Sequence, residues 1–249
     1  MNDVKTESLW LMHGDCLERM KEIPDGSVDL ILADPPYQKT QNSWDSIIPL
    51  EPMWEQINRV IKPNGAIVLF GQNTFTFKLG LSNEKMFRYT LTWEKTKAGG
   101  FLNAKRMPLQ AHEDILVFYK KLPTYNPQFE EGKPYTKKAV TNGDGRNYGN
   151  FDRVGQVSVN DGKRYPRSVQ YFRTAECENQ IHPTQKPIEL LKYLVATYSD
   201  TGEMVLDNVM GSGTCPLAAK ELNRSFIGIE KEVKYYDLAV GRVFGQHCH

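Results

Sequence analysis

Cysteine is scarce in this sequence, with four residues among 249, and no two of them form a CxxC pair. A zinc ribbon and a dense disulfide framework are therefore excluded, which favours a reducing, intracellular setting. Long apolar runs are also missing, because the N-terminus is polar and runs such as Ile67–Phe70 are far too short to span a bilayer. We therefore expect a cytoplasmic protein with no membrane partner.

Neither sign of charge is in excess, since 31 Lys and Arg residues face 30 Asp and Glu residues for a net charge of +1. This balance argues against a histone-like protein or an acidic tail, and by itself it gives no sign of nucleic-acid binding. A composition of 40% hydrophobic and 24% charged residues is typical of a folded protein. The length is sufficient for one sizeable core with an insertion.

Short apolar runs alternate along the chain with amphipathic stretches. Seven runs are strand candidates, and most of them lack polar alternation, which is typical of strands covered by helices on both faces. These runs are Leu9–Met12, Val28–Ala33, Ala66–Phe70, Phe87–Trp93, Asp114–Tyr119, Met204–Asp207 and Phe226–Ile229. Amphipathic spacing predicts helices over Pro52–Lys62, Pro187–Tyr198 and Glu232–Phe244, with Pro187 in the first helical position. The order predicts an α/β fold, a Rossmann-like seven-stranded and mostly parallel sheet with helices on both faces.

One segment, residues 120–180, has no convincing periodicity and is rich in turn residues. It contains 11 Lys and Arg residues against 7 Asp and Glu residues, so it carries +4 and the rest of the chain carries −3. It also contains eight Tyr and Phe residues, and such a segment could follow a phosphate backbone and stack on bases. The alternative is a solvated loop region with a small core of its own. We therefore divide the chain into a main domain, residues 1–119 and 181–249, and an insertion, residues 120–180.

The tetrapeptide Asp34-Pro35-Pro36-Tyr37 directly follows the predicted strand Val28–Ala33. Ligands of an open α/β sheet bind beyond the carboxyl ends of its strands, where this tetrapeptide would stand. Two consecutive prolines keep the backbone extended, so the Asp34 carboxylate and a backbone carbonyl would be presented on a rigid arm. These acceptors could bind both N–H groups of a nucleobase amino group and orient its lone pair, while Tyr37 stacks on the flipped base. An ordinary Asp-Pro turn at a strand end is the alternative.

A second strand runs into a glycine-rich turn at residues 205–214, Val-Leu-Asp-Asn-Val-Met-Gly-Ser-Gly-Thr. Glycine lets a ligand approach the backbone closely, and the N-terminus of the following helix favours a negative group. Glu230 ends the next strand, where its carboxylate could accept hydrogen bonds from ribose hydroxyls. Pro216 follows where a dinucleotide fingerprint needs a third glycine, which disfavours NAD or FAD but not another nucleoside. An ordinary tight turn is again the alternative.

Two weaker features complete the set of candidates. Asp15, in Gly14-Asp15-Cys16, could accept a hydrogen bond from an adenine amino group, and a role as helix N-cap is at least as well supported. The segment His182-Pro183-Thr184-Gln185-Lys186-Pro187 leads into a predicted helix, and by itself it fits a Thr-capped helix start.

Together these blocks resemble the β class of S-adenosylmethionine-dependent DNA amino-methyltransferases over nearly the whole chain. Further matching blocks are Pro24–Leu30, Arg59–Gly65, Trp93–Lys95, His112-Glu113 with Val117, Phe118 and Lys120, and His182–Pro187. In that family, which has a permuted version of the class I methyltransferase fold, the catalytic tetrapeptide precedes the cofactor glycines. The target-recognition region lies between them, where this chain has residues 120–180, and the resemblance therefore implies DNA recognition by the insertion.

The resemblance implies a role for each matching residue. Asp34 and the Pro35 carbonyl would hold the amino group of a flipped adenine, with Pro36 and Tyr37 completing the catalytic tetrapeptide. S-adenosylmethionine would be bound by Asp15, Cys16, Asp34, Thr184, Gln185, Lys186, Asp207, Gly211, Ser212, Gly213, Thr214 and Glu230. DNA would be contacted by Lys39, Arg146, Arg153, Lys163, Arg164 and Arg167. The family often has a large residue such as Phe in the cofactor turn, where this chain has Asn208-Val209-Met210.

The implied reaction is direct methyl transfer to N6 of adenine in double-stranded DNA, with no metal and no covalent intermediate. None of the four cysteines follows a proline, which disfavours the Cys-dependent C5-cytosine chemistry. The leading Asp34 favours adenine over N4 of cytosine, for which Ser is more common in the family. RNA or protein-glutamine methyltransferases are disfavoured by the motif order, and an inactive DNA-binding protein by the intact motifs. The resemblance also implies two possible partners, a second copy of the chain in a homodimer and a cognate restriction endonuclease.

Overall fold

The computed structural model describes residues 3–37, 48–138, 155–175 and 185–245. The chain divides into two compact units. The main unit comprises Met1–Asn126 and Ser168–His249, and the inserted unit comprises Pro127–Arg167. No helix within the described ranges combines the length and the apolar character needed to cross a bilayer.

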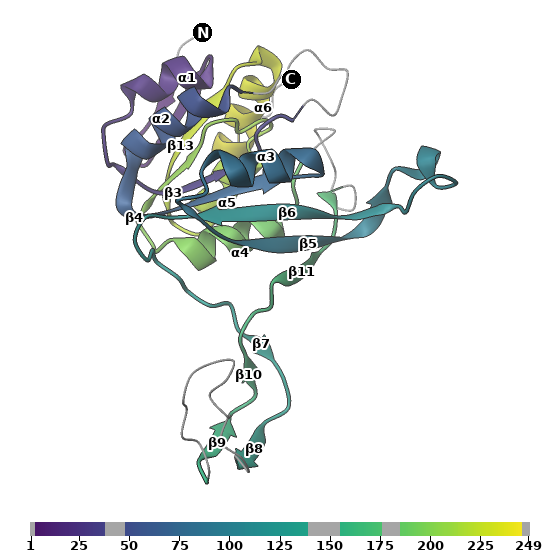
Figure 1. The fold of residues 1–249 in the computed structure, drawn as a ribbon. Helices are drawn as coiled ribbons and strands as arrows, with labels where there is room; N and C mark the ends of the chain where they lie inside the picture. Colours follow the sequence, from purple (N-terminus) through teal and green to yellow (C-terminus); the bar gives the residue numbers. More distant parts are fainter. Residues whose placement is uncertain (1–2, 38–47, 139–154, 176–184, 246–249) are drawn as a thin grey trace. The chain divides into compact units, whose positions relative to one another are not determined.

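Among the described residues of the main unit, nine strands form a single sheet (Figure 1). Their order is β1 (Val4–Lys5), β2 (Leu9–His13), β13 (Ser225–Glu230), β12 (Met204–Asp207), β3 (Val28–Ala33), β4 (Ile61–Gly71), β6 (Gln110–Phe118), β5 (Phe87–Gly99) and β11 (Val169–Phe172). The central strands β2, β13, β12, β3 and β4 run parallel, whereas β6 is antiparallel to both of its neighbours. The predicted α/β fold with a mostly parallel sheet is confirmed, and β1 and β11 extend its two edges.

Helices cover both faces of the sheet. One face packs against α1 (Cys16–Arg19), α2 (Leu50–Val60) and α3 (Thr74–Ser82), and the other against α4 (Ile188–Tyr198), α5 (Thr214–Glu221) and α6 (Val233–Phe244). Strand β3 shows why its sequence is apolar without alternation. Leu30 and Leu32 belong to the core beneath α4–α6, and Ile31 and Ala33 belong to the core beneath α1–α3. Burial on both faces therefore requires the continuous apolar run at residues 30–33, whereas Asp29, near the start of the strand, is only half-buried.

Several boundaries differ from the sequence-based prediction. α2 ends at Val60 rather than at Lys62, because Ile61 already pairs with Val28 of the neighbouring strand. Pro187 is the N-cap of α4, with an extended backbone, and is not its first helical residue. Helix α3 was not predicted at all, since its Thr, Phe and Gly residues are weak helix formers that tertiary packing overrides.

The inserted unit contains two short antiparallel ladders. In one, β7 (Glu130–Glu131) pairs with β10 (Lys163–Arg164), and in the other β8 (Tyr135–Lys138) pairs with β9 (Val157–Asn160). The rings of Phe129 and Tyr165 lie 4.9 Å apart. The sequence-based boundaries, residues 120–180, are wider than this unit, because the flanking segment Val169–Phe172 pairs in parallel with β5 of the main sheet.

The centre of the sheet is a topological switch point. β3 and β12 are neighbours, although residues 34–203 separate them in sequence. From β3 the chain continues to β4 on one side, and from β12 it continues to β13 on the other. Such a divergence opens a crevice at the carboxyl ends of the two strands, and Asp34 and Asp207 stand there.

Candidate active site

A cavity of about 590 Å³ lies at these carboxyl ends, within the main unit. Its size is in the range of small-molecule pockets, roughly 300–1,000 Å³. Thirteen of the residues expected to act in catalysis or cofactor binding contribute to its wall: Asp15, Cys16, Asp34, Pro35, Pro36, Tyr37, Gln185, Lys186, Asp207, Gly211, Ser212, Thr214 and Glu230. Gly213 is not among the lining residues. The expected site residues Thr184, Lys39, Arg146 and Arg153 lie outside the described part of the chain.

Asp34 belongs to a cluster of four alternating charges that also contains Lys186, Glu113 and Lys95. The ammonium group of Lys186 forms an ion pair with Asp34 Oδ2 and lies 3.2 Å from Glu113 Oε2. Glu113 Oε1 accepts a hydrogen bond from Lys95 Nζ. Lys186 also lies over the ring of Phe70, 5.0 Å from its centroid. The sequence grouped Lys186 with the cofactor residues, and in the structure its charged end contacts Asp34.

The cluster shifts the pKa of each of its buried members. Burial is the largest cause of the raised pKa of Asp34; Lys186 opposes this rise and the Glu113 carboxylate adds to it. Burial alone would raise the pKa of Glu113, yet the two neighbouring ammonium groups hold it below its ordinary value. Burial also disfavours the charged form of Lys186, but Asp34 and Glu113 raise its pKa well above the usual value. Lys186 is therefore a permanent cation beside Asp34.

Tyr37 stands at the wall of the same cavity. Its hydroxyl donates to Asp34 Oδ1 over 3.3 Å, and its ring stacks on Phe75 with centroids 5.3 Å apart. Burial and the nearby Asp34 carboxylate raise the pKa of Tyr37 far above its ordinary value, so the side chain remains a neutral phenol. An aromatic ring held in this way offers a flat apolar surface to a planar ligand.

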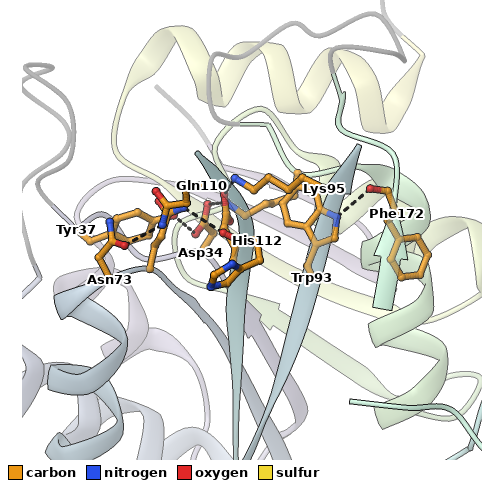
Figure 2. A network of polar contacts seen from close by, with 11 residues as sticks. Asp34, Tyr37, Asn73, Trp93, Lys95, Gln110, His112 and Phe172 are labelled. Carbon is orange, nitrogen blue, oxygen red and sulfur yellow. Dashed lines mark hydrogen bonds and ion pairs between the residues drawn. The ribbon is translucent and has the colours of Figure 1, made fainter. Parts of the chain in front are cut away.

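β5 and β6 contribute Trp93, Lys95 and Glu113 to the wall of the cavity, and Figure 2 shows polar contacts around Asp34 and these strands. Trp93 Nε1 donates to the Phe172 carbonyl over 3.0 Å, which ties β5 to β11. Gln110 donates to Asn73 Oδ1 over 2.8 Å and so links β6 to the start of α3. Sequence reasoning gave no site role to Trp93, Lys95 or Glu113. A signal was present, because an antiparallel strand places its first residues at the carboxyl ends of its parallel neighbours, and Glu113 and Lys95 are charged residues there.

The other end of the cavity carries two acidic residues. Asp207 ends β12 and accepts from the backbone N–H of Val209 over 3.0 Å, and burial raises the pKa of Asp207 to about 8. Glu230 ends β13, and its two carboxylate oxygens accept from the backbone N–H groups of Gly211 at 2.9 Å and Glu232 at 2.8 Å. Glu230 thus connects the glycine turn to the next strand. Burial raises its pKa also.

Asp15 and Cys16 begin α1 at the same end of the cavity. The Asp15 side chain accepts from the backbone N–H of Leu17 over 3.0 Å, so its predicted N-cap role is confirmed. Burial and the adjacent Asp15 carboxylate raise the pKa of the Cys16 thiol to about 12. Cys16 is therefore a neutral wall residue and no nucleophile.

The residues at this end fit a nucleoside-bearing cofactor such as S-adenosylmethionine. Asn208 is almost fully buried in the wall, and its Nδ2 has no hydrogen-bond partner among the described residues. Gly211 has a φ of +52°, and no atom lies within 4 Å of the position that a Cβ would take, so the backbone is open to a ligand. Such a ligand needs an accessible backbone, which Gly211 offers, and acceptors for its hydroxyl and ammonium groups, which the two acidic residues offer. It would also supply the acceptor that the buried Asn208 amide lacks.

The packing of α6 explains why residue 213 is a glycine. It caps α5 with a φ of +80°, and a Cβ there would lie 2.8 Å from both Cα and Cβ of Ala239 in α6. Arg242, also of α6, donates to the Ser212 carbonyl at 2.8 Å and to Thr214 Oγ1 at 3.1 Å. The close packing of α6 therefore holds the glycine turn in place.

Three of the expected DNA-contacting residues, Lys163, Arg164 and Arg167, lie in the described part of the inserted unit, and none of them lines this cavity. Lys163 and Arg167 are exposed. Arg164 is half-buried: its guanidinium donates to the Lys133 carbonyl and to Asn160 Oδ1, and it lies 4.8 Å from the centroid of the Tyr135 ring. Arg164 is thus engaged within its own unit.

Comparisons with known proteins agree with this geometry. The model of the N6/N4 DNA methylase family matches residues 28–241. DNA adenine methyltransferase YhdJ of Escherichia coli is 30% identical over 97% of this chain and 83% of its own. The structure of M1.HpyAVI in complex with SAM is 25% identical with a TM-score of 0.65, covering 94% of this chain and 98% of that one. The cytosine-N4-specific PvuII DNA methyltransferase shares the fold at 14% identity, with a TM-score of 0.70 over 98% of this chain and 89% of that one.

Proposed function

The chain belongs to the N6/N4 DNA methylase family, and from its site we propose that it transfers a methyl group from S-adenosylmethionine to N6 of adenine in double-stranded DNA. One observation carries the proposal: Asp34-Pro35-Pro36-Tyr37 and the acidic glycine turn Asp207–Thr214 open into the same cavity. An amino-group binding arm and a nucleoside site within one pocket can bring two reactants into contact.

The cofactor end of the cavity would hold S-adenosylmethionine through Asp207, the Gly211 backbone, Glu230 and Asp15. When bound, the cofactor supplies an electrophilic methyl group. Glu230 would accept from the ribose hydroxyls, while its bonds to the Gly211 and Glu232 N–H groups keep the carboxylate in position.

The tetrapeptide would prepare the amino group of the base. The lone pair of this nitrogen is delocalised into the ring, which makes it a poor nucleophile. Asp34 and the Pro35 carbonyl would accept its two N–H bonds and draw the nitrogen toward a pyramidal geometry, which frees the lone pair. Tyr37 would stack on the base, which must leave the duplex for its amino group to be reached.

Lys186 would control the charge of Asp34 during this process. Its ammonium group contacts Oδ2 and favours the ionised carboxylate, which is the form that accepts an amino N–H. After transfer the nitrogen is cationic and must lose a proton. Asp34 is the nearest acceptor, and its raised pKa makes it a better base than an exposed carboxylate.

Adenine is the proposed target for two reasons. The tetrapeptide begins with Asp34, and the relative YhdJ is named as a DNA adenine methyltransferase. The inserted unit would contact the target DNA through Arg146, Arg153, Lys163 and Arg167, and Lys39 would do so from the main unit. Arg164, expected with them from the sequence, is engaged within the inserted unit. A homodimer, a cognate restriction endonuclease and a cytoplasmic location stay predictions from the sequence.

Incorporation of tritiated methyl groups into unmethylated duplex DNA, RNA and protein tests the function directly. We expect label only in DNA and, after digestion to nucleosides, only in N6-methyladenine. Label in N4-methylcytosine would overturn the choice of base, and label confined to RNA or protein would overturn the choice of substrate. Sequencing that maps modified bases in DNA from expressing cells would give the recognition sequence.

Substitution of the catalytic carboxylate tests the mechanism. Asp34→Ala should lower methyl transfer at least about a thousandfold, because it removes an acceptor made for the reacting nitrogen. Cofactor binding, measured by calorimetry, should survive. Glu18→Gln, which removes an exposed carboxylate from α1, serves as the matched control and should keep full activity. Near-normal turnover of Asp34→Ala would contradict the mechanism.

A further inference from the structure

The hairpin of β5 and β6 projects beyond the neighbouring strands and ends in a tip, residues 99–109 (Figure 1). All residues of the tip are exposed. Four of them are large and apolar, Phe101, Leu102, Met107 and Leu109, and the exposed fractions of Phe101 and Leu102 are 75% and 85%. So much exposed apolar surface on one short segment is typical of a contact site.

The tip is a folded turn that holds these side chains in place. Gly100 has a φ of +83°, and the 3-10 turn η2 (Phe101–Asn103) follows it. The N–H of Asn103 donates to the Gly100 carbonyl at 2.9 Å, and the N–H of Met107 donates to the Asn103 carbonyl at 3.0 Å. The bond between Gln110 and Asn73 anchors the hairpin where it leaves the sheet. The apolar residues are therefore presented in a defined arrangement.

Basic residues flank the apolar ones. Lys97, Lys105 and Arg106 are exposed, and no Asp or Glu occurs between Lys95 and Ala111. An apolar surface bordered only by cations is complementary to duplex DNA, in which phosphates border stacked bases. A second protein surface would not require this charge pattern.

The tip also stands at the mouth of the active site. Lys97, Gly99 and Phe101 line the same cavity as Asp34 and Tyr37. A base that enters this cavity from a duplex would therefore lie close to the tip, and the gap that it leaves in the stack would lie near Phe101.

We propose that the tip enters the duplex beside the target base, where Phe101 and Leu102 fill the space that the flipped base vacates and Lys105 and Arg106 contact phosphates. Apolar wedges that separate base steps work in this way in other DNA-bending proteins. The proposal rests on the proposed function and names the part of this chain that opens the duplex.

The test compares two duplexes that carry the recognition sequence. In one the target adenine is paired with thymine, and in the other it faces an abasic site, so that flipping it costs less. The double variant Phe101→Ala, Leu102→Ala should methylate the paired duplex at least about tenfold more slowly. Its alanines cannot fill the space that the flipped base leaves, so the free-energy cost of unstacking the base is no longer offset. It should methylate the unpaired duplex within about twofold of wild type, and its cofactor affinity should be unchanged.

A matched control is available on α3. Phe77 and Leu81 are also exposed, at 71% and 74%, and neither lines the cavity. The variant Phe77→Ala, Leu81→Ala should behave as wild type on both duplexes. Lys105→Gln with Arg106→Gln should weaken binding to either duplex and reduce its salt dependence.

Two results would overturn the proposal that Phe101 and Leu102 enter the duplex. The Phe101 and Leu102 variant could lose equal activity on both duplexes, which would place these residues in general substrate binding, or it could lose none. A change from dimer to monomer in sedimentation, with an equal loss on both duplexes, would assign the tip to a second copy of the chain. If the proposed function itself is wrong, the wild-type protein would methylate neither duplex, and this result distinguishes that failure from failure of the proposal for the tip.

Discussion

At the scale of single residues, Asp34 lies between a cation that favours its ionised form and burial that disfavours it. Lys186 contacts its Oδ2, and Glu113 contacts Lys186 from the other side. The two neighbours act on the pKa of Asp34 in opposite directions, Lys186 lowering it and Glu113 raising it. Opposite effects of two buried neighbours can be separated experimentally.

The acid limb of the pH–rate profile should follow the protonation of Asp34, because only the carboxylate accepts the amino N–H. Lys186→Met removes the cation that lowers the pKa of Asp34, so the limb should move to higher pH. Glu113→Gln removes the like charge, so the limb should move to lower pH. The measurement is kcat/KM between pH 5 and 9.

Lys192→Met, which removes a lysine from the exposed side of α4, is the control and should leave the limb in place. If Lys186 and Glu113 served packing alone, both variants would lose activity without opposite shifts of the limb. Limbs that coincide with wild type would contradict the assigned roles.

Burial of the Asp207 carboxyl group makes the stability of the folded protein depend on pH. Its pKa in the folded protein is about 8, mainly because of burial, whereas an unfolded Asp titrates near 3.9. Between these values the folded chain binds a proton that the unfolded chain does not, so stability falls as pH rises through this range. Each unit costs up to about 1.4 kcal/mol, and the loss levels off above about pH 8.

Asp207→Asn removes this titration while keeping the shape of the side chain. In the absence of cofactor, its stability relative to wild type should increase steadily from pH 5 to pH 8. Urea unfolding at pH 5, 7 and 9 measures the difference, and the titration of all other groups is shared by the two proteins. Parallel pH dependences would show that Asp207 is ionised in the folded state at pH 5.

At the scale of secondary-structure elements, the glycine turn separates a ligand-facing position from a packing position. Gly211 opens toward the cavity, with no atom near a prospective Cβ, whereas Gly213 would bring a Cβ to 2.8 Å from Ala239 of α6. Both have positive φ, so the backbone strain of an alanine is common to the two sites.

Gly213→Ala should therefore lower the free energy of unfolding by about 2–4 kcal/mol, from backbone strain and overpacking against α6. Gly211→Ala should cost only about 1 kcal/mol but weaken cofactor binding, because its methyl group enters the cavity. Thermal unfolding with and without S-adenosylmethionine distinguishes the two. Equal destabilisation would contradict this division.

Elements with a strong local signal could be predicted from the sequence, and those that depend on tertiary packing could not. β3 and β12 have the predicted bounds because most of their residues are apolar and an Asp marks the carboxyl end of each, Asp34 after β3 and Asp207 at the end of β12. α3 contains β-branched, aromatic and glycine residues, and forms a helix because Phe75 and Leu79 are buried against the sheet.

The same distinction holds for the site. Asp34 and Asp207 could be identified because Asp34 directly follows an apolar strand and Asp207 ends one. Glu113 and Lys186 could not be joined to Asp34, since their contact depends on how β6 and the start of α4 meet around β3. Nothing local in the sequence records which strands become neighbours in a sheet.

At the scale of the whole molecule, the net charge of +1 conceals a separation of charge. Residues 120–180 carry +4 and the remainder carries −3. Within this segment the basic residues differ in what they contact. Arg164 is bound to the Lys133 carbonyl and to Asn160 in the inserted unit, whereas Lys163 on the same strand is exposed. Net charge alone cannot tell a cation that binds DNA from one that stabilises its own unit.

The neighbours Lys163 and Arg164 therefore offer a test of DNA recognition by the inserted unit. Lys163→Gln should weaken DNA binding and reduce the slope of log K against log salt by about 0.9, as expected for one lost phosphate contact, without changing thermal stability. Arg164→Gln should lower thermal stability, because it removes hydrogen bonds from the inserted unit. Lys21→Gln in the main unit, where Glu18 pairs with the lysine, is the control for loss of a surface cation. A slope unchanged by Lys163→Gln would show that this exposed lysine makes no phosphate contact. It would then favour the alternative left open by the sequence, in which the segment is a solvated region with a small core of its own.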